Sequence, residues 1–218
     1  EIDFKSGENS VSGTGTLTIR SKSTSRDYNI GSAGESSGGG DLSDSASDNG
    51  ALDLSMLDCA AIADDFTSVT IGHRATGNLM YVGDAQDQSK IKYTQQARTV
   101  RAALRNDTIF VAERINVAGA VEAPDKLIQL QARLIDIKSR NLHVPMGPLD
   151  SGLTASRIIL DVEEQLQVSG WIKATSLVQI HVTATTGSNT MSTSSDGPIS
   201  LATDTTALIQ TLAAASVI

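Results

Sequence analysis

Two stretches of the sequence about 50 residues apart repeat one pattern, and this repeat constrains the fold more than any other feature. INVAGAVEAPDKLIQLQARL (115–134) aligns with LQVSGWIKATSLVQIHVTA (166–184) when one residue is deleted. The alignment matches Val117 with Val168, Gly119 with Gly170, Val121 with Ile172, Ala123 with Ala174, Ile128 with Val178 and Leu130 with Ile180. Repeated strand, glycine turn and strand is typical of stacked coils, because each coil buries its apolar face only on its neighbours. The repeat therefore predicts a β-solenoid, with the 50-residue unit covering two coils.

The repeat also predicts which side chains form the core. Apolar character is kept at six matched positions while the polar residues between them differ. We expect these six side chains to point inward and to stack in register: Val117, Ile128, Leu130, Val168, Val178 and Ile180. Aromatic residues make up only 3% of the chain, so the core must consist of Val, Ile, Leu and Ala.

Short apolar strand patterns recur about every ten residues along much of the chain, as in a sandwich, a barrel or a solenoid. The expected strands are 15–21, 28–32, 69–71, 79–82, 108–111, 115–117, 127–130, 134–137, 157–162, 166–168, 177–184 and 198–202. We expect one domain over residues 1–218, with a Ser/Gly-rich loop at 34–50. Because the chain opens on Glu1 rather than Met, we expect either upstream processing or a segment of a longer polypeptide.

One short amphipathic helix is expected near residues 55–65, where alanines and apolar residues at three- and four-residue spacing follow Ser55. Ser55 can cap the first turn and Asp58 places a carboxylate near the positive end of the helix dipole. We expect this helix to cover the end or the side of the coils, since open solenoid ends expose unpaired strand edges. The side chains expected to pack inward are Leu57, Ala61 and Ile62, and those expected to point outward are Asp58 and Asp65.

These residues carry a resemblance to a known family. The order of elements resembles the repeat unit of the giant filamentous-haemagglutinin-like adhesins of bacteria, over roughly residues 52–184. The motif residues are Phe66, Ser68, Val69, Thr70, Ile71 and Gly72 in one strand, Gly77 and Leu79 in the next, and Ile115, Val117 and Gly119 before a third. The resemblance implies a right-handed parallel β-helix and a fibrous or adhesive role, outside the cell or on its surface.

Catalytic motifs are missing from the sequence. His73, His143 and His181 lie far apart, and no H-x-x-x-H, C-x-x-C or G-x-S-x-G spacing occurs. We expect these histidines to face solvent or to form local hydrogen bonds. The only cysteine, Cys59, lies among alanines, where a small buried hydrophobic residue is expected. We therefore predict a non-enzymatic protein without a catalytic residue or a cofactor.

Acidic residues supply the alternative function. Asp161, Glu163 and Glu164 could provide the paired carboxylates of a polysaccharide-cleaving enzyme, provided that two of them face each other across a groove. The only tryptophan, Trp171, stands at the position matched by Ala120, which indicates an outer or cap position rather than a sugar cleft. A carbohydrate-binding or polysaccharide-cleaving β-helix protein is therefore the alternative to a structural one.

Two further motifs concern metal binding and modification. Asp41, Asp44 and Asp48 share one loop and are weak candidates for calcium binding, because their spacing fits neither an EF-hand nor the calcium-binding nonapeptide. A solvated acidic turn is the simpler expectation. Residues 106–108, Asn-Asp-Thr, form an N-glycosylation sequon, which matters only in a secretory lineage.

Charge and hydropathy limit the partners. The net charge of −8 and the pI near 4.8 argue against a nucleic-acid partner. No run of 18 apolar residues occurs, so we expect no membrane span.

The C-terminal segment is apolar to its last residue, and the predicted self-association residues are Leu208, Ile209, Leu212, Val217 and Ile218. It can fold back on its own coils or dock on the next subunit. We favour docking into a homo-oligomer or filament, with surface glycans as a second partner class.

Overall fold

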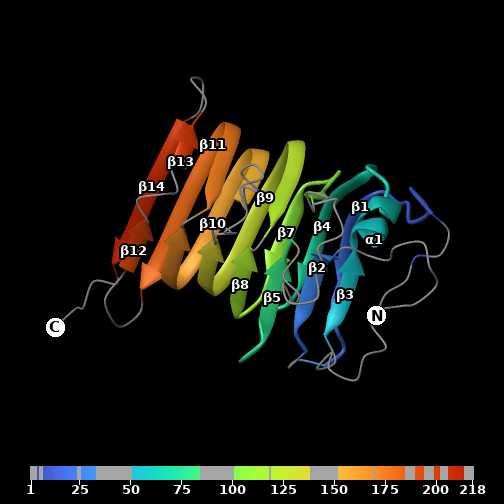
Figure 1. Ribbon diagram of the computed structural model, residues 1–218, viewed down its shortest axis with the longest axis horizontal. Helices are drawn as coiled ribbons and strands as arrows, with labels where there is room; N and C mark the ends of the chain where they lie inside the picture. The colour runs from blue at the N-terminus through green and yellow to red at the C-terminus, as the bar shows by residue number, and fades with distance from the viewer. Residues whose placement is uncertain are drawn as a thin grey trace, which may run out of the picture.

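The strands of the computed structural model run side by side, and every strand pairing among the described residues is parallel (Figure 1). The structure describes residues 4, 7–23, 26–32, 51–83, 101–117, 119–137, 152–168, 170–184, 190–193, 199–201 and 206–213. Within this part of the chain the strands form one 14-stranded curled sheet, with a single short helix. The predicted Ser/Gly-rich loop at 34–50 lies outside the described residues.

Three long strands explain why the sheet curls. They are β9 (Ala120–Ile137), β10 (Gly152–Val168) and β11 (Trp171–Ala184). The register of β10 shifts between Ala155 and Arg157, and again between Val162 and Gln165. Each shift marks a corner where the strand bends without losing its neighbour, so a single strand contributes to more than one stack of pairs. The sequence predicted separate strands at 127–130 and 134–137, and the structure joins them in β9.

The pairs therefore form three stacks, which we name A, B and C. Stack A contains β1 (Gly15–Ile19), β4 (Phe66–Gly72), β7 (Thr108–Val111), the middle parts of β9 and β10, the last residues of β11, and β14 (Thr206–Ala213). Stack B contains β3 (Leu52–Ser55), β2 (Tyr28–Ser32), β5 (Leu79–Val82), β8 (Arg114–Val117), the last residues of β9 and β10, and β12 (Thr190–Thr193). Stack C contains β6 (Arg101–Ala103), the first residues of β9, β10 and β11, and β13 (Ile199–Leu201). From residue 56 onward the chain passes repeatedly through C, A and B in that order, with helix α1 (Met56–Ala61) in the first C position, and we call each such passage a circuit.

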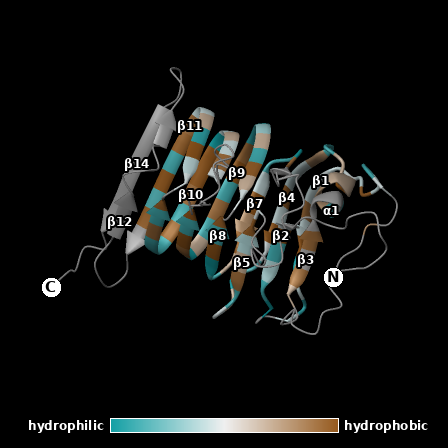
Figure 2. Ribbon diagram, in the orientation of Figure 1, coloured by the Kyte–Doolittle hydropathy of each residue, from teal (hydrophilic) through white to brown (hydrophobic). Residues whose placement is uncertain are grey.

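The core lies inside these circuits. Strands alternate apolar and polar residues, visible as alternating brown and teal bands (Figure 2), and the apolar residues point inward. In stack A the register aligns Ile71, Phe110, Leu130, Leu160 and Ile180, none more than 1% exposed. Burying whole rows of branched side chains in this way stabilises each circuit through its neighbours.

The core predicted from the repeat is confirmed. All six residues are buried, with at most 3% exposure: Val117, Ile128, Leu130, Val168, Val178 and Ile180. They also stack in register, because Ile158 separates Ile128 from Val178, and Leu160 separates Leu130 from Ile180. One circuit thus lies between the two copies, which confirms that the 50-residue unit covers two circuits.

The helix forms where it was predicted but is shorter than residues 55–65. Helix α1 spans Met56–Ala61, and Ile62 instead pairs with Val11 in a parallel bridge. The Val11 amide donates to the Ala61 carbonyl at 3.0 Å, and the Val11 carbonyl accepts from the Ala63 amide at 2.9 Å. These bonds engage backbone groups that a longer helix would use itself, so the helix ends at Ala61.

Helix α1 contacts β6, β3 and β2, so it lies at the N-terminal end of stack C, as the expected cap. Ala61 and Ile62 are buried and Asp65 is exposed, as predicted. The prediction for Asp58 was wrong: its side chain is 8% exposed and accepts a hydrogen bond from the Phe4 amide at 3.1 Å. The contact comes from a residue 54 positions earlier in the chain, which helical periodicity alone does not reveal. The side chain of Leu57 lies outside the described part of the structure.

Candidate functional site

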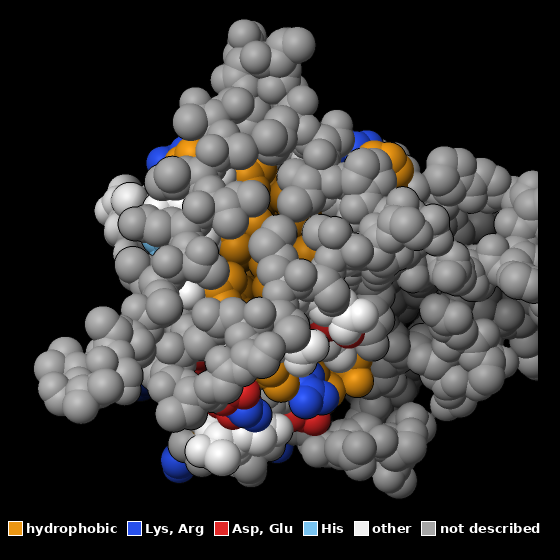
Figure 3. Space-filling view, turned by 90° about the vertical axis from the view of Figure 1, so that its left-hand side faces the viewer, with side chains coloured by type: hydrophobic (Ala, Val, Ile, Leu, Met, Phe, Trp, Pro, Cys, Tyr) orange, Lys and Arg blue, Asp and Glu red, His pale blue; other side chains and the backbone are white. Residues whose placement is uncertain are grey.

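The C-terminal end of the three stacks is the first candidate site. Within the described residues, β12, β13 and β14 each pair with one neighbour only, namely β10, β11 and β11. A strand paired on one side presents backbone N–H and C=O groups along its other edge, and these groups can pair with another chain. Figure 3 looks onto this end, where hydrophobic side chains of the described residues are visible near the centre.

Three of the five predicted self-association residues lie in β14. The register pairs Leu208 with Gln179, Ile209 with Ile180 and Leu212 with Thr183. The backbone of residues 206–213 thus lies on the chain's own stack, the first of the two arrangements that the sequence left open, and its second edge has no described partner. Val217 and Ile218 lie outside the described residues.

The N-terminal end is built differently. Stack A begins with β1 and stack B with β3, but stack C begins with helix α1. Strands therefore end stacks A and B at both ends of the described structure, whereas stack C has a helix at one end and β13 at the other. This asymmetry limits which strands of two copies could pair end to end.

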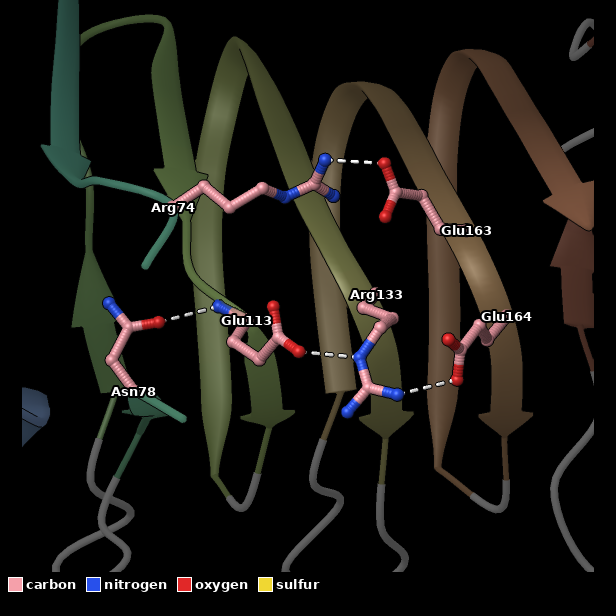
Figure 4. A network of polar contacts seen from close by, with 6 residues as sticks. All are labelled: Arg74, Asn78, Glu113, Arg133, Glu163 and Glu164. Atoms are coloured by element: carbon pink, nitrogen blue, oxygen red, sulfur yellow. Dashed lines mark hydrogen bonds and ion pairs between the residues drawn. The ribbon is translucent and has the colours of Figure 1, made fainter. Parts of the chain in front are cut away.

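A polar ladder follows the corner between stacks A and B, and is the second candidate site (Figure 4). Arg133 donates from Nε to Glu113 at 2.5 Å and from a guanidinium nitrogen to Glu164 at 2.7 Å. The hydrogen bonds that Arg133 donates to Glu164 and Glu113 raise the pKa of Arg133 above its usual value. Glu113 also donates its backbone amide to the Asn78 side-chain oxygen at 2.7 Å, so the ladder links four successive circuits.

The remaining carboxylates named as acid–base candidates also have partners. Glu163 forms an ion pair with Arg74 (Figure 4). Asp161 accepts from the Gln129 side-chain amide at 2.6 Å and lies 2.9 Å from Nδ1 of His181. The contacts of Asp161 and Glu164 join successive circuits, whereas the Arg74–Glu163 pair reaches from the segment after β4 to β10. Asp161, Glu163 and Glu164 therefore each hold strands together at the surface.

Hydrogen bonding around His181 fixes its tautomer. Nε2 of His181 lies 2.6 Å from the Gln179 amide nitrogen, which can only donate. Nε2 therefore accepts, and Nδ1 carries the proton that it donates to Asp161. The pair resembles the His–Asp unit of a general base, but Gln179 occupies the nitrogen that would take a proton.

The other histidines and the cysteine are placed as follows. His73 lies with Nδ1 2.7 Å from the hydroxyl of Tyr28, a hydrogen bond to a residue 45 positions earlier rather than to a sequence neighbour. His143 lies outside the described residues. Cys59 is buried, as predicted, and burial together with the neighbouring Asp58 raises the pKa of its thiol to about 12. The thiol is therefore almost entirely protonated at neutral pH, which suppresses its nucleophilicity.

Trp171 is half-buried on stack C, where Lys173 lies 4.7 Å from its ring centroid. The register aligns it with Gly152 and then Ala120, the residue that the repeat had matched to it. A Cβ on Gly152 would overlap the Trp171 backbone, so only glycine fits there. One face of the ring is therefore contacted by a charged side chain of the same strand.

The calcium candidates Asp41, Asp44 and Asp48 lie outside the described residues. Among the residues that are described, no three His, Cys, Asp or Glu side chains come together as metal ligands. No helix in the described part of the chain is both long and apolar enough to cross a membrane.

Sequence reasoning missed the corner ladder and the contacts of Asp161. Arg133 and Glu113 are 20 residues apart, whereas Arg133 and Glu164 are 31 apart, so no single period exposes the ladder. Comparison with known proteins found no matching family model, no matching curated protein and no matching solved structure.

Proposed function

We propose that this chain is a non-enzymatic structural protein, a right-handed parallel β-helix that associates end to end into a fibre, sheath or cell-surface filament. The observation that carries the proposal is the C-terminal end, where all three stacks finish in strands paired on one side within the described structure. Repeated passage through stacks C, A and B supports the solenoid part of the proposal.

Head-to-tail contact suits stacks A and B best. A second copy would bring its β1 and β3 against β14 and β12, and parallel pairing would continue through both stacks. In stack C, the three-residue β13 would meet helix α1, so little pairing is lost there. Such a contact is heterologous and can propagate into a filament.

An extracellular or cell-surface location belongs to the same proposal and is supported by the resemblance to filamentous-haemagglutinin-like repeats. Protease treatment of intact cells tests it: digestion without lysis is expected, and protection until lysis would argue against this location.

The association test uses paired proline substitutions in β14. Neighbouring residues in a strand point their backbone amides to opposite sides, and proline has no amide hydrogen. One of the two variants, Gln210→Pro or Thr211→Pro, therefore loses a hydrogen bond to β11, and the other loses a donor on the open edge. We expect the variant with the smaller loss of thermal stability to be the one that fails to assemble, measured by sedimentation velocity and negative-stain microscopy.

Three outcomes would contradict the proposal. They are a monomeric intact protein at high concentration, unchanged filaments in both proline variants, and filaments that persist after deletion of residues 207–218. The alternative, a carbohydrate-binding or polysaccharide-cleaving protein, would be supported by saccharide binding that quenches Trp171 fluorescence in a protein that stays monomeric.

A further inference from the structure

The N-glycosylation sequon at residues 106–108 is the only one in the sequence, and the structure encloses it. It lies between β6 and β7, at the corner where the chain passes from stack C to stack A. Asn106 and Thr108 are each only 2% exposed. An acceptor asparagine must reach the active site of a transferase, so the position of Asn106 in the folded chain decides whether this motif can be used.

The Asn106 amide links two circuits. Its nitrogen Nδ2 donates to the Ala63 carbonyl at 2.8 Å, and that carbonyl belongs to the segment between α1 and β4. The carbonyl can only accept, so the amide orientation is fixed with the nitrogen facing Ala63. The other amide atom, Oδ1, is buried without a hydrogen-bond partner among the described atoms. The acceptor group is therefore enclosed on both sides.

The other two sequon residues are also engaged. The Thr108 hydroxyl donates to the Asn106 carbonyl at 2.9 Å. Asp107 accepts from the Leu127 amide at 2.9 Å and pairs with Arg157 at 3.0 Å, which ties this corner to the next two circuits. Extracting the sequon would break contacts in three neighbouring circuits, so local opening of this segment requires much of the fold to open.

We infer that Asn106 accepts a glycan only before the chain folds, and that glycosylation at this position excludes the folded structure. The transfer forms a bond between Nδ2 and the anomeric carbon of a lipid-diphosphate-linked oligosaccharide, breaks the bond from that carbon to the diphosphate oxygen, and releases one Nδ2 proton to a base of the transferase. The remaining N–H could still donate to Ala63. The glycan itself has no space, because the side chain is enclosed and Ala63 is 7% exposed.

The test compares folded and nascent full-length chain. Purified folded protein is incubated with an oligosaccharyltransferase and its lipid-linked oligosaccharide, and modification is located by mass spectrometry. The variant Lys22→Asn serves as the matched control, since it completes a second sequon with Ser23 and Thr24 at an exposed position. We expect modification at position 22. The rate at Asn106 should be lower by a factor on the order of 10³ or more, because even a marginally stable fold favours its closed state by about this factor.

The nascent arm translates the full chain into microsomes behind a cleavable signal sequence. We expect glycosylation at Asn106 in a fraction of these chains, abolished by Asn106→Gln, and we expect the glycosylated fraction alone to remain protease-sensitive. Glycosylation of folded protein at Asn106 at the rate of the exposed control would overturn the inference. So would glycosylated chains as protease-resistant as unmodified ones, or no glycan in the nascent chains.

Discussion

Substituting a single stacked residue tests the register of the whole core. Val168 is fully buried in stack B, paired with Ile137 on one side and Thr193 on the other. Val168→Asp removes the burial of an apolar side chain, which stabilises by about 1.5–3 kcal/mol. It also places a carboxyl group among apolar neighbours, at a further cost of several kcal/mol. The combined loss is about 4 kcal/mol or more, a large fraction of a typical stability of 5–15 kcal/mol.

Thermal unfolding followed by far-UV circular dichroism measures this loss. At about 2–4 °C for each kcal/mol in a chain of this size, the midpoint should fall by about 10 °C or more. Gln167→Asp is the matched control, because the preceding side chain is exposed and a surface substitution costs within about 0.5 kcal/mol.

The deficit should also depend on pH. Burial raises the pKa of the introduced carboxyl above its unfolded value of about 3.9, so the folded state retains a proton that the unfolded state releases. The deficit of Val168→Asp should therefore be smallest below that pH and grow as pH rises towards the folded pKa. Equal midpoints for Val168→Asp and the wild type, or a larger loss in Gln167→Asp, would refute the register.

Further predictions concern a glycine, a thiol and an ion pair. Gly72→Ala should destabilise by at least about 2 kcal/mol in denaturant titration, because the new Cβ would overlap the Val111 carbonyl oxygen at a positive φ of 92°. Gly77→Ala, with φ of 86° but open space around it, should cost only about 1 kcal/mol, and equal losses would argue against the close approach. Native Cys59 should resist a thiol reagent at pH 8 until denaturant is added. Between pH 9 and about 12 the stability of wild type relative to Cys59→Ala should fall by about 1.4 kcal/mol per pH unit, because the folded state keeps the thiol proton that the unfolded state loses. Arg133→Met should lower the free energy of unfolding by about 1 kcal/mol or less at low salt, and by less still at 1 M salt. A loss that does not change with salt would show that side-chain packing rather than charge stabilises the ladder.

Much of the fold could be predicted because its main signals are local. A strand with one buried face must alternate, so Val69 and Ile71 revealed β4 without knowledge of its neighbours. A circuit buries its apolar residues against the next circuit, so the match of Leu130 with Ile180 revealed stacked inward positions. These inferences need only period and repeat.

The helix was predicted less accurately because distant residues determine its end. Apolar spacing continues to Phe66, but Val11 bonds to the backbone at Ala61 and Ala63 and stops the helix. Asp58 was placed outward by the same periodicity, although the backbone amide of Phe4 donates to its carboxylate. Both errors arise from a segment some 50 residues earlier in the chain, which no local pattern includes.

The sequence alone determined the alternation within strands, the rows of inward-pointing residues and the stacking of repeats. All of these follow from burying a branched side chain at every second position of a strand. Only the tertiary structure decided which polar groups meet. Arg133 reaches Glu113 and Glu164, Asp161 reaches His181, and Asn106 is enclosed by Ala63. The physical reason is that circuits differ in length: Leu153 follows its partner Val121 by 32 residues, whereas Ile172 follows Leu153 by 19. Stacking tolerates such loops as long as the inward rows stay aligned, so polar contacts between circuits are set by the three-dimensional register and have no fixed spacing in the sequence.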